Sequence, residues 1–191
     1  ITVVTANSGG EKRDTTFTIQ HERVRPAGGL LVSADGIATA RFDPAGVYHA
    51  FEGRITPIDV PPELPQPIGS AYRFEPDTIP FREMAQVHLS VPAGTDRSKL
   101  GVYELTNKGW SFVWNDVDTS RNTVGAGVRH FSVYALFEDR VPPEVEFLEP
   151  AEGATTGTLP EIRVALRDGM SGISMEELIS FELDKHPMIF E

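Results

Sequence analysis

Short apolar runs separated by closely spaced turn signals constrain the fold of this chain more than any other feature. The 191 residues include 15 prolines and 17 glycines, scattered at short intervals. The stretch Ile37–Phe42 alternates Ile, Thr and Arg with Ala, Ala and Phe, which is the period of a half-buried β-strand. Similar pieces recur along the chain, and almost no segment has a helical period. The sequence therefore predicts an all-β protein built as an antiparallel β-sandwich.

The predicted strands follow one another in short steps. An N-terminal hairpin is expected from Ile1–Ala6 and Thr15–Gln20, with a polar turn between them. Residues 58–69 contain four prolines and should form a crossover on the surface, because proline has no N–H to donate within a sheet. Five strand-like pieces come next: SAYRFEP, MAQVHLSVP, LGVYELT, WSFVWND and NTVGAGVRHFSVYALF. VEFLEP, EIRVALRD and the alternation Ile179, Phe181, Leu183 predict strands nearer the C-terminal end.

Charge and composition narrow the classes of partner. The chain has 28 acidic and 17 basic residues, a formal net charge of −11. This argues against nucleic acid and anionic membranes, both of which attract basic proteins. No apolar run approaches the roughly 20 residues that span a bilayer, so membrane insertion is not expected. Cysteine is absent, which excludes disulfides and thiolate chemistry, and no cofactor is indicated.

Several spaced elements together resemble the ZU-type β-sandwich domain of ankyrins, netrin receptors and many bacterial surface proteins. The matching elements, in order, are Phe74-Glu75-Pro76 with Phe81, Val102-Tyr103 with Trp110, and a closing His130-Phe131-Ser132. They agree in order over roughly residues 28–137. The resemblance implies a sandwich domain in the middle of the chain.

The flanking segments are similar to bacterial immunoglobulin-like repeats. The stretch beginning DRVPPEVEFLEP resembles the start of such a repeat, and ITVVTANSGGEKRDTTFTI resembles its last hairpin, with Asn7-Ser8-Gly9-Gly10 in place of the usual turn. The two resemblances imply a terminal hairpin over residues 1–24, a ZU-like sandwich over 25–140 and an incomplete immunoglobulin-like repeat over 141–191. They also imply an extracellular or cell-surface location in a bacterium.

The two incomplete flanks raise the possibility of strand exchange. The N-terminal hairpin could complete the C-terminal half, within one chain or from a neighbouring domain, because each leaves strand edges unpaired. A boundary set by cloning or proteolysis is the simpler explanation, and we favour it.

The segment Val128–Phe137 carries the sharpest chemical hypothesis. In eukaryotic relatives of the ZU-type domain, a His-Phe-Ser segment can cut its own backbone between Phe and Ser. Carried over, the Ser132 hydroxyl would attack the carbonyl carbon of Phe131, with His130 as the base and Phe131 as an anchor in the core. An N-to-O acyl shift would give an ester that water hydrolyses.

A plain strand explains the same residues without chemistry. Phe131, Val133 and Ala135 would face one side of the sheet, and His130, Ser132 and Tyr134 would face the other. We therefore regard autoproteolysis as the less favoured hypothesis.

Other candidate sites rest on weaker patterns. Asp116 and Asp118 crowd one turn beside Asn115, and Asp168 lies in another turn, so these carboxylates are weak calcium candidates. Asp and Asn also favour turns for backbone reasons alone, and we predict no metal site. The five histidines lack the spacing of zinc ligands. Trp110, Phe112 and Trp114 alternate and could form a sugar-stacking platform if exposed, although such a stripe more often faces a core.

These observations favour a structural role. We expect a non-catalytic adhesion, spacer or protein-interaction module of a larger bacterial surface or secreted protein, with a protein or a glycan at the cell surface as partner. Self-cleavage between Phe131 and Ser132 is the first alternative, and carbohydrate binding is the second.

Overall fold

The computed structural model confirms an all-β protein with an antiparallel β-sandwich. It describes residues 2–6, 12–16, 21–151, 153–154, 157, 161–171 and 179–189. The chain divides into two compact units, residues 1–137 and 138–191, which are described separately below.

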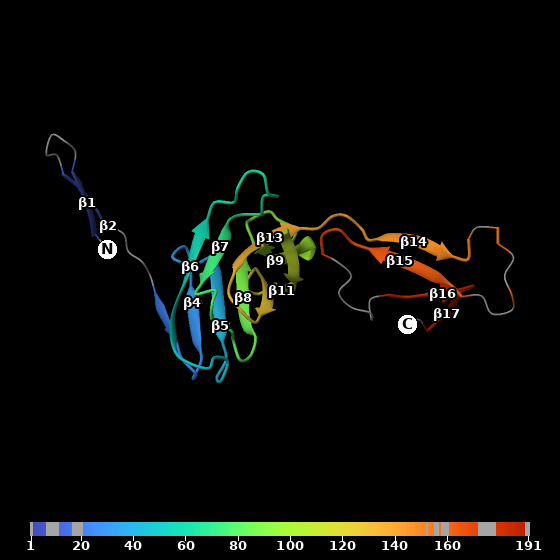
Figure 1. Ribbon diagram of the computed structural model, residues 1–191, viewed down its shortest axis with the longest axis horizontal. Coiled ribbons are helices and arrows are strands. Elements are labelled where there is room, and N and C mark those ends of the chain that lie inside the picture. The colour runs from blue at the N-terminus through green and yellow to red at the C-terminus, as the bar shows by residue number, and fades with distance from the viewer. Residues whose placement is uncertain are drawn as a thin grey trace. The chain divides into compact units, whose positions relative to one another are not determined.

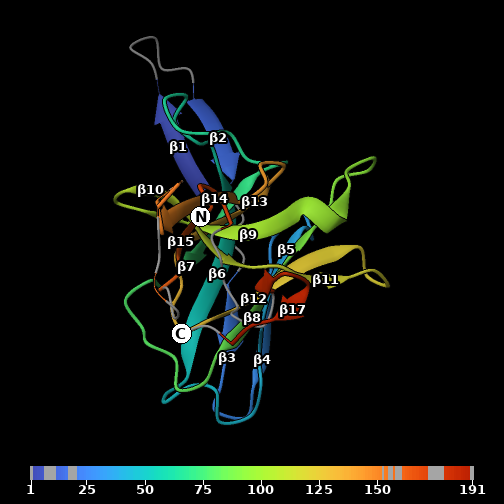
Figure 2. The same ribbon diagram turned by 90° about the vertical axis from the view of Figure 1, so that its right-hand side faces the viewer.

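Two antiparallel sheets form the sandwich (Figures 1 and 2). The six-stranded sheet has the order β10 (Gly109–Trp114), β9 (Leu100–Thr106), β13 (Val133–Glu138), β7 (Ala71–Glu75), β6 (Phe51–Ile58) and β3 (Glu22–Val24). The five-stranded sheet has the order β11 (Asp116–Asp118), β12 (Thr123–Val128), β8 (Ala85–Ser90), β5 (Ala38–Phe42) and β4 (Gly29–Val32). A short 3₁₀ helix, η1 (Arg97–Lys99), precedes β9.

Alternating residues from both sheets fill the space between them, as the period of a strand requires. The predicted alternation in β5 is confirmed, because its two alanines and Phe42 are buried whereas Arg41 is exposed. The largest fully buried side chains of the interior are Phe74, Phe131, Tyr134, Leu31, Leu89, Leu100 and Leu136. Within this interior, the rings of Phe42 (β5), Phe51 (β6) and Phe74 (β7) gather around Phe131.

The outer face of the six-stranded sheet carries a second apolar cluster. Tyr103, Phe137, Ala71 and Ala135 are buried there. Trp110, Phe112, Val133, Ile58 and Val60 pack against them. Val60 lies in the proline-rich segment, and residues 59–70 contain no strand, so the prediction that this segment leaves the sheet is confirmed. The indole N–H of Trp110 donates to Pro65 O at 3.1 Å, which ties the segment to the sheet.

The chain passes directly between the two layers at both sides of the sandwich. On one side, β3 leads into β4 through a tight turn in which Arg25 and Gly28 exchange backbone hydrogen bonds. On the other side, only Asn115 separates β10 from β11. The pairings make β3 antiparallel to β13, so the start of β3 and the end of β13 point to the same end of the six-stranded sheet.

Two predicted strands prove to be pairs of strands in opposite sheets. WSFVWND divides into β10 and β11, and NTVGAGVRHFSVYALF divides into β12 and β13, with Arg129–Ser132 crossing between the layers. The expectation that Phe131 faces the same side as Val133 and Ala135 was therefore wrong. Its ring packs in the main core with Tyr134 and Leu136, whereas Val133 and Ala135 belong to the outer cluster. The physical reason is that the chain changes layer here without a glycine or proline to interrupt the alternation.

The N-terminal hairpin is present, but its second strand begins earlier than predicted. β1 (Thr2–Ala6) pairs with β2 (Lys12–Thr16), with Thr2 opposite Thr16 and Ala6 opposite Lys12. The remainder of the predicted second strand, residues 17–20, and the turn at Asn7–Gly10 lie outside the described residues.

The second unit contains short antiparallel pairs. β14 (Glu144–Glu149) pairs with β15 (Arg163–Arg167), and β16 (Glu182–Leu183) pairs with β17 (His186–Pro187). Of the predicted alternation near the C-terminal end, Leu183 lies in β16, whereas Ile179 and Phe181 precede it. Residues 172–178 lie outside the described part of the chain. Whether this unit is an immunoglobulin-like repeat stays a prediction.

Candidate functional site

The His-Phe-Ser segment lies in the crossover between β12 and β13, and its backbone is held at three carbonyls. The N–H of Phe81 donates to Arg129 O at 3.0 Å, and the N–H of Phe74 donates to Ser132 O at 2.9 Å. Between them, the hydroxyl of Tyr134 donates to His130 O at 2.8 Å. These bonds hold the peptide units on both sides of the Phe131–Ser132 peptide.

Phe131 anchors the crossover in the core. Its side chain is 1% exposed and is surrounded by four other rings. The centroids of these rings lie 4.8 Å (Phe81), 5.6 Å (Phe74), 5.7 Å (Phe42) and 6.2 Å (Phe51) from that of Phe131. Aromatic pairs of this kind contribute about 0.5–1.5 kcal/mol each beyond their buried area. The ring therefore holds the Phe131–Ser132 peptide at a defined place between the layers.

The imidazole of His130 lies beside the carbonyl of the next residue, Phe131. Its Nδ1 lies 3.2 Å from Phe131 O, and its side chain is 53% exposed. A carbonyl oxygen only accepts hydrogen bonds, so this contact is favourable when Nδ1 carries the proton. In that tautomer the ring would donate to the carbonyl of the bond that would be cut, and Nε2 would be left for any role as a base.

Glu104 is a residue that sequence reasoning missed. Its Oε1 lies 3.8 Å from Nδ1 of His130, and its side chain is 23% exposed. Glu104 alternates along β9 with Leu100 and Val102, both fully buried in the main core. The available signal was an acidic residue at a position that alternates with inward-facing apolar residues. Burial and the nearby Glu104 charge together raise the pKa of Tyr134 well above its ordinary value.

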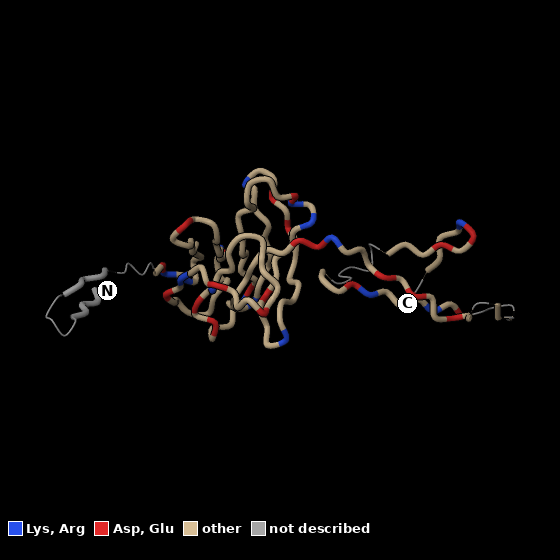
Figure 3. Tube along the Cα trace, turned by 90° about the horizontal axis from the view of Figure 1, so that it is seen from above, with Lys and Arg blue, Asp and Glu red and all other residues tan. Residues whose placement is uncertain are grey.

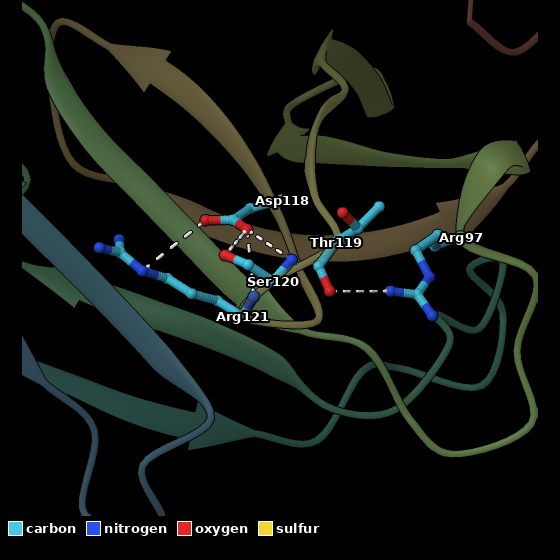
Figure 4. Close-up of polar contacts among 5 residues, drawn as sticks. All are labelled: Arg97, Asp118, Thr119, Ser120 and Arg121. Carbon is cyan, nitrogen blue, oxygen red and sulfur yellow. Dashed lines mark hydrogen bonds and ion pairs between the residues drawn. The ribbon is translucent and has the colours of Figure 1, made fainter.

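The carboxylate of Asp118, a calcium candidate, accepts hydrogen bonds from residues of its own turn (Figure 4). Its Oδ1 accepts from the Ser120 hydroxyl at 2.6 Å and from the backbone N–H groups of Ser120 and Arg121 at 2.9 and 3.1 Å. The hydroxyl of Ser120, followed by the N–H of Arg121, lowers the pKa of Asp118. Arg97 donates to Thr119 O at 3.4 Å, linking this turn to η1. The arrangement is a hydrogen-bonded Asx-type turn.

The other two calcium candidates lie apart from such a cluster. Asp116 is exposed at the start of β11 opposite Gly125. Asp168 belongs to the second unit, where its Oδ1 accepts from the N–H of Met170 at 2.9 Å. Among the described residues, no group of three His, Cys, Asp or Glu side chains is placed to hold a metal ion. Acidic and basic residues are scattered over the strands and loops of the sandwich (Figure 3).

The three aromatic residues of β10 do not form one stripe. Trp110 and Phe112 pack on the outer cluster, with the Trp110 ring 4.9 Å from Phe137 and the Phe112 ring 5.4 Å from Tyr103. A β-bulge follows Phe112 and places Trp114 opposite Val102, whose side chain faces the main core. Trp114 is 36% exposed. The alternation of three aromatic residues therefore does not continue on one face, because the bulge moves Trp114 off the face shared by Trp110 and Phe112.

No protein-family model matches the chain, and no curated protein matches it either. Within the described residues, the structure has no helix with the length and apolar character needed to cross a membrane.

Proposed function

We propose that this chain is a non-catalytic structural and interaction module of a larger bacterial surface or secreted protein. The observation that supports this most is the filled sandwich followed directly along the chain by a second unit with its own antiparallel pair, β14–β15. A succession of small β units is typical of modular extracellular proteins. The resemblance of the sandwich to ZU-type domains, and of the flanks to immunoglobulin-like repeats, points in the same direction.

An antibody raised against the chain tests the location on which this function depends. Intact cells of the source bacterium, or its culture medium, should bind the antibody, and external protease should remove the cell-bound signal. An antibody against a cytoplasmic protein serves as the control for intact cells. Signal that appears only after the cells are permeabilised would refute the proposal.

The second candidate is a self-processing module that cuts between Phe131 and Ser132. The observation that favours it is the contact of His130 Nδ1 with Phe131 O, beside a ring buried to 1% exposure. In this reaction the Ser132 Oγ bonds to the Phe131 carbonyl carbon, the C–N bond to Ser132 breaks, and the hydroxyl proton moves to the released nitrogen. Water then hydrolyses the ester and gives two chains with ordinary ends.

Denaturing electrophoresis and intact mass measurement separate the two candidates. Cleavage gives fragments of 131 and 60 residues. Ser132→Ala should leave one chain, and Ser90→Ala, a change at a serine in β8, is the matched control that should still be cut. A single band of full mass for the purified wild-type chain after prolonged incubation would remove the self-processing hypothesis.

A further inference from the structure

We propose that Glu104 is a positioning residue that holds the proton of neutral His130 on Nδ1, so that His130 donates a hydrogen bond to the carbonyl of Phe131. The inference concerns the second candidate function and rests on it for its chemical use. The arrangement of the ring itself is a separate property that can be measured in an uncut chain.

The first step concerns which ring nitrogen of His130 faces the neighbouring oxygen atoms. Nδ1 is the ring nitrogen directed at Phe131 O, at 3.2 Å, and the same nitrogen is the one nearest Glu104, at 3.8 Å. Both neighbours are oxygen acceptors, and one of them belongs to a carboxylate. A bare nitrogen lone pair at that place would face two regions of negative charge, whereas an N–H is attracted by both. The two contacts therefore favour the same tautomer.

The second step is the placement of the carboxylate. Glu104 shares the inward period of β9 with Leu100 and Val102, and β9 has neighbours on both sides, β10 and β13. Inward-pointing charges that protect an exposed sheet edge occur on edge strands, so edge protection does not explain Glu104. A charge of low exposure at the end of a core requires a polar partner, and the imidazole of His130 supplies it.

The third step is the consequence for the peptide bond. A donor aimed at Phe131 O draws electron density from the carbonyl and would stabilise the oxyanion that forms when Ser132 Oγ adds to the carbon. Tyr134 and Phe74 hold the carbonyls of His130 and Ser132 on either side, which limits rotation of the peptide during the addition. In this arrangement His130 assists the attack as a hydrogen-bond donor through Nδ1. The hydroxyl proton ends on the nitrogen of Ser132, so the step balances without an added reactant.

Nitrogen NMR of an uncut chain tests the tautomer directly. In ¹⁵N-labelled Ser132→Ala protein, a multiple-bond ¹H–¹⁵N spectrum recorded with the imidazole neutral should show Nδ1 as the protonated nitrogen of His130. The resonances are assigned by comparison with a His130→Gln chain. Glu104→Gln, which removes the charge but keeps the shape, should shift the tautomer ratio toward Nε2–H by roughly 10-fold, the usual effect of one nearby charge. Glu52→Gln, a change at an exposed glutamate of β6, should leave the ratio as it is.

The outcomes separate this inference from the cleavage hypothesis. Nε2–H as the main tautomer of His130, or a ratio unchanged by Glu104→Gln, would overturn the role of Glu104. If the tautomer follows the expectation but the wild-type chain is never cut, the positioning contact stands and the self-processing function fails. If the chain is cut, Glu104→Gln should slow the reaction by roughly 10-fold in chains that keep Ser132, and an unchanged rate would refute the catalytic use of the contact.

Discussion

The ring of Phe131 packs edge-on against the ring of Phe81, with their centroids 4.8 Å apart and their planes at 82°. Phe81 also donates its backbone N–H to Arg129 O, so the same residue contacts the crossover through its ring and through its main chain. This double contact fixes the layer change between β12 and β13, and the stability of the sandwich should depend on it.

Phe131→Ala should lower the free energy of unfolding by about 3–5 kcal/mol, because it removes a ring surrounded by four others and leaves a cavity. The matched control is Phe147→Ala, a change at a side chain that is 59% exposed in the second unit. Urea unfolding followed by tryptophan fluorescence reports on the sandwich, where both tryptophans lie. Equal effects of the two substitutions would contradict the anchoring role of Phe131.

If the chain is cut after Phe131, the two fragments should stay together under native conditions. The C-terminal fragment retains β13, which lies between β9 and β7 of the N-terminal fragment. Size-exclusion chromatography should therefore give one peak at the mass of the intact chain, and denaturing electrophoresis of that peak should give two bands. Separate native peaks would show that β13 does not hold the fragments.

Trp110→Phe should loosen the proline-rich segment 59–70 from the outer face of the six-stranded sheet. The substitution keeps an aromatic ring near Phe137 but removes the indole donor to Pro65 O, at a cost of about 1 kcal/mol. Limited proteolysis should then cut within the segment faster than in the wild type. Trp114→Phe, which removes no such bond, is the control, and identical digestion of both variants would contradict the prediction.

The sandwich should lose stability at low pH because the stabilising contribution of the Asp35 carboxylate is lost there. Partial loss of hydration raises the pKa of its mostly exposed carboxyl, but hydrogen bonds from Ser33, Ile37 and Tyr72 outweigh that effect and hold the pKa below its ordinary value of 3.8. A carboxylate with a lowered pKa in the folded state stabilises it above the unfolded pKa, and this contribution is lost as the pH falls through the folded pKa.

Asp35→Asn should therefore cost about 1 kcal/mol near neutral pH, a figure discounted because the carboxylate is exposed, and the difference from wild type should shrink below about pH 4. Unfolding curves across this pH range measure it. Asp59→Asn, at an exposed aspartate of the proline-rich segment, is the control. A difference that stays constant with pH would show that the Asp35 charge does not contribute.

The sequence predicted the strands better than their assignment to layers. Alternation located β5, and the four prolines placed residues 59–70 outside the sheets. The crossovers at Asn115 and at Arg129–Ser132 were missed because neither contains a glycine or proline, so each pair of strands was taken as one. Only packing between sheets decides such a layer change, and period-2 patterns carry no information about it.

The candidate site was found only in part for a related reason. The tripeptide His130-Phe131-Ser132 was visible as a pattern, and the buried anchor at Phe131 agrees with the expectation. Glu104 is 26 residues away in sequence and approaches His130 only because β9 and β13 are neighbours in the sheet. The alternation Leu100, Val102, Glu104 could have marked the glutamate as unusual, but not its partner.

The start of β3 and the end of β13 lie at the same end of the six-stranded sheet, and this has a mechanical consequence. Pulling the sandwich apart through these two strands would load the pairs that join β3 to β6, from Glu22 to Val24, one after another instead of all at once. Bonds that break in sequence resist little force. Under tension the sandwich would therefore release β3 first and lengthen in small steps before its core opens.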